Sequence, residues 1–321
     1  AGPIRWLSMG GNHPRFLFMP DNDRGYRLRP FFEGFEVQPN GDFFLPVQIN
    51  QWGLRDHHDL RNLRSFRILA LGDSFTFGEG VATDKTFLAV MEKKLRDYHP
   101  DIDCINAGVP GYGLRQIFSQ ASGLVTVIKP QVILLSFRPT LFNREEAPFR
   151  YSHGYIFKPP VHREIVEYGA WTIFTFPEKG TLRELDLILQ KHSLLYLYIK
   201  YPVYDRVYRA LFLRNLKFVL RRENLTVTFS ILTMMNQWCL QRKIALIVVP
   251  LCSNQKEAAL LEQLLSENSL AGKSVVIDEW DNDPSRTRRL TFAHDIHLNE
   301  DGHAEVARRM TAIFHEFYRG Q

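Results

Sequence analysis

Five short apolar runs recur along the chain with helix-like patterns between them, and this alternation restricts the fold more than any other feature. It is typical of a parallel β-sheet that is covered by helices. We therefore predict an α/β fold whose core begins near residue 66. The predicted strands are FRILAL (66–71), DCIN (103–106), VILLSF (132–137), IALIVVP (244–250) and SVVID (274–278).

Two segments between or after these runs have helical periodicity. In the first, apolar residues at i, i+3, i+4 and i+8 from Phe87 predict one buried helix face, with Thr83 as the N-cap. The second segment closes the chain and predicts a C-terminal helix that begins soon after Gly302. Its apolar stripe consists of Val306, Met310, Ile313, Phe314 and Phe317.

Two regions depart from the alternation. Residues 1–65 are rich in Gly, Pro, Asn and aromatic residues, so we expect a β-rich extension that packs on the core formed by residues 66–321. More than a hundred residues separate the third and fourth runs, which predicts an insertion at about 141–225 and a helix at about 226–242. We interpret the tyrosine-rich part of the insertion as an amphipathic lid. A membrane-surface face or a glycan-stacking platform remains an alternative.

Composition excludes several classes of protein. With 321 residues, 45% of them hydrophobic, the chain can bury a substantial core. Its 40 basic and 35 acidic residues are interspersed, so we do not expect a strong positive field that would bind nucleic acid. A local basic face on the surface remains an alternative. The three cysteines lack paired spacing and indicate neither a disulfide framework nor a zinc site. No apolar run is long enough to span a membrane.

The stretch ILALGDSFTFGEG, residues 68–80, places a serine directly after a buried strand and a tight turn. Ser74 would then lie at the carboxyl edge of the sheet, where open α/β folds bind ligands. A serine hydroxyl needs an adjacent base to act as a nucleophile. His297 follows the fifth run and precedes the last helix, so the topology brings it to the same edge.

Three motifs together resemble the SGNH or GDSL hydrolases, which are serine esterases and acyltransferases with a three-layer α/β/α fold and a five-stranded parallel sheet. The matching motifs are GDS (72–74), INAGVPGYG (105–113) and HLNEDGH (297–303). The resemblance implies that Ser74 is the nucleophile and His297 the general base. It also implies that the N–H groups of Ser74 and Gly111 donate to the oxyanion, and that no cofactor is used.

Two positions depart from the family pattern. The asparagine that supplies a third oxyanion donor in the family aligns with Thr140, and the nearest asparagine is Asn143. Either side chain is a candidate donor. The family aspartate lies three residues before the histidine, where this chain has His294, whereas Asp295 lies two residues before. We predict that Asp295 orients His297.

Other site chemistries have less support. His294, Asp295 and His297 are an alternative metal-binding group, but no HExxH or paired-cysteine motif adds a further ligand. The glycines of residues 108–113 do not follow the order of a dinucleotide-binding loop.

The predicted function is an acyl ester hydrolase or O-acyltransferase with a Ser-His-Asp triad. NQWGLRD (50–56) is similar to a segment of cell-envelope members, including relatives of alginate O-acetyltransferases, so we expect an acylated glycan or small ester as substrate. The alternative is a non-catalytic binding or assembly protein of the envelope whose third motif has eroded. We expect an extracytoplasmic or periplasmic location, with peripheral membrane or envelope-complex association and an anchor outside this chain. A cytoplasmic location is the alternative.

Overall fold

The computed structural model describes residues 5–8, 17–38, 41–144, 150–152, 155–157, 222–277, 289–293 and 295–318, with a few residues between 181 and 196. The predicted insertion at 141–225 lies mostly outside this described part of the chain. None of the helices within it has the length and apolar character needed to cross a membrane.

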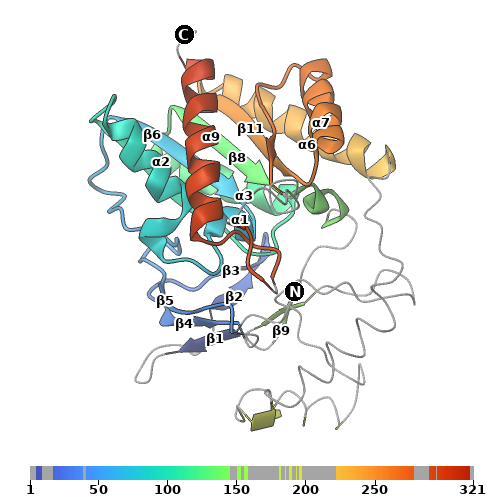
Figure 1. The fold of residues 1–321 in the computed structure, drawn as a ribbon. Helices are drawn as coiled ribbons and strands as arrows, with labels where there is room; N and C mark the ends of the chain where they lie inside the picture. The colour runs from blue at the N-terminus through green and yellow to red at the C-terminus, as the bar shows by residue number, and fades with distance from the viewer. Residues whose placement is uncertain are drawn as a thin grey trace.

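A five-stranded parallel sheet forms the centre of the molecule, in the order β12-β11-β8-β6-β7 (Figure 1). Every neighbouring pair of strands runs parallel. Each strand falls on one of the five apolar runs, so the predicted fold class is confirmed. The strands are β6 (Phe66–Gly72), β7 (Ile102–Gly108), β8 (Val132–Phe137), β11 (Ala245–Cys252) and β12 (Val275–Val276).

Helices cover both faces of this sheet, which is why its strands are apolar at nearly every position. In β6, Ile68 and Ala70 face one cluster of buried side chains, while Leu69 and Leu71 face the other. The first cluster includes α2 (Phe87–Arg96) and α9 (Glu300–Tyr318). The second includes α3 (Leu114–Ile128), α6 (Arg222–Leu240) and α7 (Gln255–Glu267), on the opposite side in Figure 1.

Two predicted helix starts need correction. The side chain of Thr86, rather than Thr83, caps α2 by accepting a hydrogen bond from the Ala89 N–H. Thr83 instead begins the short 3-10 helix η1 (Thr83–Lys85), because the chain makes one extra turn before α2. The C-terminal helix begins at Glu300, so Gly302 lies inside it. Gly302 is tolerated there because its missing Cβ leaves room for the Leu290 carbonyl group.

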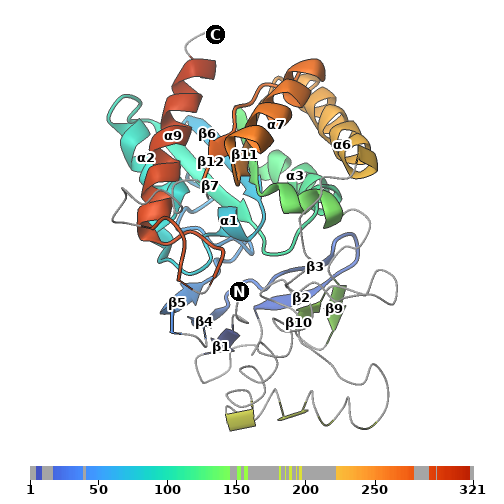
Figure 2. The same cartoon turned by 45° about the vertical axis from the view of Figure 1, so that its right-hand side comes forward.

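The N-terminal region forms short antiparallel strands beside the core (Figure 2). Its apolar side chains join the second cluster of the main core. Tyr26 donates a hydrogen bond to the Pro110 carbonyl group over 2.9 Å, and Tyr112 donates to the Tyr26 carbonyl group over 2.6 Å. The strands are β1 (Arg5–Ser8), β4 (Glu33–Val37) and β5 (Phe44–Gln48) in one sheet, and the hairpin β2 (Phe18–Asp21) and β3 (Gly25–Leu28).

Beyond β8 the chain continues as the 3-10 helix η2 (Pro139–Arg144). A small hairpin of β9 (Arg150–Ser152) and β10 (Tyr155–Phe157) comes next in the described residues, and β9 lies against β2 and β3. The hairpin of β2 and β3 therefore contacts both the loop after β7 and the strand β9.

Candidate active site

Ser74 is the first residue of α1 (Ser74–Phe77), immediately after β6. The preceding Asp73 caps this short helix by accepting a hydrogen bond from the Phe75 N–H over 3.1 Å. At Gly72, a Cβ atom would collide with the Thr76 side chain and the Ser136 carbonyl group, so only glycine allows this close turn. The turn therefore leaves Ser74 at the carboxyl end of β6.

Strand β6 occupies the point where the strand order changes direction. The chain pairs β7 with one edge of β6, crosses back, and pairs β8 with the other edge. Loops after two such strands diverge, and ligands bind in the crevice that this divergence leaves at the carboxyl edge. Ser74 lies at this place.

The structure brings Ser74, His297 and Asp295 together. The Nε2 atom of His297 is 2.8 Å from Oγ of Ser74, and Nδ1 is 2.5 Å from Oδ1 of Asp295. Asp295 also accepts a hydrogen bond from the His297 backbone N–H over 2.9 Å, which closes a local turn. This turn lets an aspartate two residues before the histidine reach its ring. His294 lies outside the described residues.

All three side chains are buried, with Ser74 and His297 each 4% exposed. Gln38, which follows β4, donates a hydrogen bond to Oδ2 of Asp295 over 3.1 Å. Burial alone would raise the pKa of Asp295, but the charge of His297 and its two hydrogen bonds lower it. The Asp295 carboxyl group is thus held ionised beside the ring. The His297 ring also packs on Phe75, with 4.8 Å between ring centroids.

The sequence predicts that two backbone N–H groups donate to the oxyanion. Those of Ser74 and Gly111 donate no hydrogen bond to any described residue. Gly111 has a φ angle of +79°, a conformation that glycine adopts without strain and that turns the loop after β7. Thr140 lies in η2 and is exposed. The backbone of Asn143 lies in the same 3-10 helix, but its side chain is outside the described residues.

Arg144, which the sequence analysis did not predict, contacts both the GDS motif and the INAGVPGYG motif. Its Nη1 atom donates to Oδ2 of Asp73 over 3.0 Å and to the Tyr112 carbonyl group over 2.9 Å. One side chain from the segment after β8 thus holds the turn before Ser74 and the loop that contains Gly111. No spacing pattern pointed to it, because an arginine after a strand is usually solvated.

A buried set of charges behind the triad was also missed. Glu36, Arg55 and Glu79 are each 0% exposed, and Nη1 of Arg55 is 3.8 Å from Oε2 of Glu36. Arg55 donates to the Gly78 carbonyl group over 2.6 Å, which fixes the loop after α1. Arg55 falls within NQWGLRD (50–56), but the sequence predicted no role for it. Glu79 Oε1 is 3.4 Å from Nδ1 of His297.

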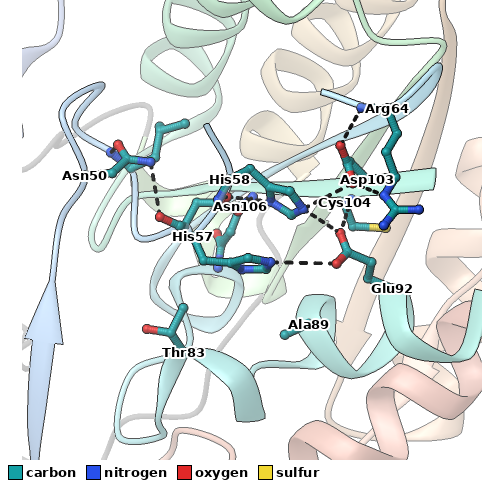
Figure 3. A network of polar contacts seen from close by, with 12 residues as sticks. Asn50, His57, His58, Arg64, Thr83, Ala89, Glu92, Asp103, Cys104 and Asn106 are labelled. Atoms are coloured by element: carbon teal, nitrogen blue, oxygen red, sulfur yellow. Dashed lines mark hydrogen bonds and ion pairs between the residues drawn. The ribbon is translucent and has the colours of Figure 1, made fainter. Parts of the chain in front are cut away.

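A second histidine cluster lies away from the triad, between α2, β7 and residues 56–64 (Figure 3). Nδ1 of His58 is 2.7 Å from Oδ1 of Asp56, and Nε2 is 3.0 Å from Oε2 of Glu92 and 3.4 Å from Oδ1 of Asp103. One histidine and several carboxylates at these distances are within the range of a metal site.

Positively charged side chains of the protein already pair with these carboxylates. Nη2 of Arg96 is 2.7 Å from Oδ1 of Asp103 and 3.0 Å from Oε1 of Glu92, and backbone N–H groups donate to both side chains. Burial would lower the pKa of His58, but the carboxylates of Asp56 and Glu92 raise it to about 10. Because Arg96 and His58 supply the positive charge that a metal ion would supply, we assign no metal to this cluster.

No family model matches the sequence, and no curated protein matches it either. Solved structures are similar at low identity. A lipolytic protein of the G-D-S-L family from Desulfitobacterium hafniense is 11% identical, with 78% of this chain and 99% of that chain covered and a TM-score of 0.41.

Two further structures have the same degree of similarity. The psychrotrophic esterase EstA from Pseudoalteromonas sp. is 10% identical over 79% of this chain and 98% of that one, with a TM-score of 0.44. A catalytic mutant of an acetylxylan esterase from Geobacillus stearothermophilus is 13% identical over 78% and 95%, with a TM-score of 0.42. Similarity of this size does not assign the chain to a family, so its function has to be inferred from the geometry of the site.

Proposed function

We propose that the chain is a serine-dependent acyl ester hydrolase or O-acyltransferase. The observation that carries this proposal is the line of contacts from Ser74 Oγ to His297 Nε2 and from Nδ1 to the ionised Asp295, all of it buried at the carboxyl edge of the sheet. Nucleophile, base and orienting acid need this order and these distances for acyl transfer.

The reaction proceeds in two halves. Oγ of Ser74 attacks the ester carbonyl carbon while its proton passes to Nε2 of His297, and the N–H groups of Ser74 and Gly111 hold the oxyanion. The ester C–O bond then breaks, and the alcohol leaves with the proton from Nε2. An acceptor hydroxyl next gives its proton to Nε2 and attacks the acyl carbon of the acyl-serine. The bond from that carbon to Oγ then breaks, and Oγ takes the proton back from Nε2, which restores Ser74. Water as acceptor makes the chain an esterase, and a sugar hydroxyl makes it a transferase.

We propose an acylated glycan as the substrate class. The support is the resemblance of residues 50–56 to cell-envelope acetyltransferase relatives and the tyrosine-rich composition of the insertion, since aromatic rings stack on sugars. To separate hydrolysis from transfer, the protein is given an acetyl donor with an oligosaccharide acceptor. Acetylated oligosaccharide, detected by mass spectrometry, identifies the transferase.

The direct test compares the wild type with Ser74→Ala. We expect the wild type to hydrolyse p-nitrophenyl acetate and to be labelled by a fluorophosphonate, and we expect Ser74→Ala to lose the label and about 10⁴-fold or more of the rate. Ser122→Ala is the matched control, because Ser122 is exposed on α3, and it should behave as the wild type. A wild type with neither hydrolysis nor label would instead support a non-catalytic binding protein.

A further inference from the structure

We propose that Glu79 is a second acid for His297: it faces the same ring nitrogen as Asp295 and takes over the orientation of the ring when the Asp295 carboxylate is lost. The proposal rests on the proposed function for its role in catalysis. It also assigns a second task to the GDSFTFGEG stretch, since Glu79 follows Ser74 by five residues.

The geometry places two carboxyl groups at one nitrogen. Nδ1 of His297 is 2.5 Å from Oδ1 of Asp295 and 3.4 Å from Oε1 of Glu79, whereas Nε2 on the other side of the ring faces Ser74. A small rotation of the Glu79 side chain or of the ring therefore exchanges one acid for the other. The nucleophile does not have to move.

Glu79 is fully buried although its carboxyl group has no hydrogen-bond partner among the described residues, and packing alone does not explain this. The residue is 0% exposed, and neither oxygen of its carboxyl group makes a hydrogen bond to a described residue. A buried polar group without a partner destabilises the fold, and in native proteins such groups are concentrated at functional sites. Glu79 is aimed at His297 rather than at solvent.

The charges around the triad determine which acid is ionised. Asp73 is paired with Arg144, and Asp295 is paired with His297. Glu36 and Glu79 share the positive charge of Arg55, and His297 adds to it at Glu36. Burial raises the pKa of Glu79 well above its usual range, and the negative charges of Glu36 and Asp295 raise it further. Glu79 therefore keeps its proton while Asp295 is ionised.

Removal of the Asp295 carboxyl group makes Glu79 the ionised acid beside His297. One of the negative charges that keep Glu79 protonated disappears, and the space beside Nδ1 opens. Glu79 then ionises and accepts the Nδ1–H hydrogen bond, so that Nε2 remains the free base that Ser74 needs. This is a positioning role, because Glu79 acts through the histidine and does not touch the substrate.

A double-mutant comparison of ester hydrolysis tests the exchange. We expect Asp295→Ala to lose about 10²-fold in kcat, and Asp295→Ala with Glu79→Gln to lose about 10⁴-fold, the loss typical of a triad without its acid. The matched control is Asp295→Ala with Glu92→Gln, which makes the same buried change in the His58 cluster. It should have the rate of Asp295→Ala. Equal rates for the Glu79 double variant and Asp295→Ala would overturn the proposal.

A measurement independent of turnover separates this proposal from the proposed function. The ¹⁵N chemical shifts of the His297 ring report which nitrogen holds the proton. We expect the Nδ1–H tautomer in the wild type and in Asp295→Ala, and its loss in the Glu79 double variant. The proposal is wrong if Asp295→Ala alone loses this tautomer. Absence of fluorophosphonate labelling would reject the esterase, while the tautomer would still decide the role of Glu79.

Discussion

Two buried histidines in this molecule each face two or more carboxyl groups, and they differ in what else surrounds those groups. Around His58, Arg96 contacts Glu92 and Asp103, and backbone N–H groups supply further hydrogen bonds. Around His297, Glu79 has no hydrogen-bond partner among the described residues. Nε2 of His58 contacts Glu92 as an ion pair rather than as a hydrogen bond, but every carboxyl group around it has a hydrogen-bond partner. We therefore call the carboxyl groups around His58 a saturated cluster and those around His297 an unsaturated cluster.

The difference separates a structural role from a chemical one. A saturated network is rigid, and its histidine serves as a fixed cation between elements. An unsaturated network leaves a ring nitrogen and a carboxyl group able to change partners, which catalysis requires. Histidine clusters in a new chain are therefore better compared by whether their carboxyl groups have hydrogen-bond partners than by their residue types.

The largest predicted effect is on the rate of ester hydrolysis, and it comes from a change in the unsaturated cluster around His297. His297→Ala should lower ester hydrolysis by about 10⁴-fold, because Ser74 loses its base. Its free energy of unfolding should also fall, because the buried Asp295 loses its partner, so the rate is compared per folded molecule with the folded fraction taken from urea denaturation. A variant that unfolds readily but hydrolyses normally once folded would show that the roles of the two clusters are the reverse of those assigned.

The saturated side predicts the opposite pattern. His58→Gln removes a cation from between buried carboxylates, and leaving such charges unpaired costs about 3 kcal/mol of stability. The rate per folded molecule should stay at the wild-type level, because His58 does not contact the triad. Urea denaturation and p-nitrophenyl acetate hydrolysis on the same sample check both halves. A large loss of rate with unchanged stability would contradict the structural role.

Alkaline pH should weaken the saturated cluster. The folded-state pKa of His58 is raised to about 10 from an ordinary value of 6.5. The stabilisation is therefore fully present below pH 6.5 and is lost as the pH rises toward 10. Denaturation midpoints at pH 7, 8.5 and 10 should fall more steeply for the wild type than for His58→Gln. Parallel slopes would show that His58 is not the titrating group.

A third buried histidine predicts the opposite slope. His303 is 1% exposed and accepts a hydrogen bond from the Phe87 N–H over 3.0 Å, and burial lowers its pKa to about 3. Its stabilisation is present above pH 6.5 and is lost as the pH falls toward 3, by about 1 kcal/mol over the first pH unit. His303→Gln keeps an acceptor but does not titrate. It should flatten the acid side of the stability profile, and an unchanged profile would refute the assignment.

The smallest effect concerns the outer oxygen of the triad acid. Gln38→Met removes the hydrogen bond to Oδ2 of Asp295 while keeping the volume of the side chain. We expect kcat to fall about 5-fold, equivalent to about 1 kcal/mol, with KM unchanged, because the substrate is not contacted. Steady-state kinetics measure both constants. A change confined to KM would mean that Gln38 lies in the substrate path instead.

Periodicity predicted the sheet and its helices because every strand is covered on both faces and is therefore apolar throughout. Ser74 and His297 could be placed at one edge because each follows a predicted strand. Asp295 could be predicted because a carboxylate two residues before a histidine reaches Nδ1 if the chain turns between them, and the structure contains this turn. Helix starts were less predictable. Both Thr83 and Thr86 are suitable caps, and only the extra turn of η1 decides between them.

The remaining parts of the site depend on contacts that no local pattern encodes. Glu36 lies in β4 and Gln38 follows it directly, and the sequence predicted that this region packs on the core without indicating which residues it meets. Arg144 was overlooked because its partners, Asp73 and Tyr112, come from two other segments. Glu79 lies next to the GDS motif, but its charged neighbours Glu36 and Asp295 come from distant parts of the sequence, so no local pattern predicts its role.

The hydrogen bond from Gln38 to Asp295 joins residues that are 257 positions apart in the chain. During synthesis β4 and Gln38 leave the ribosome 257 positions before their partner residue Asp295 and have to wait for it. Long-range closure of this kind is slow and comes late in folding. The proposed triad is therefore completed only after the loop with Asp295 and His297 has been made, so a chain truncated before that loop would carry Ser74 without its base.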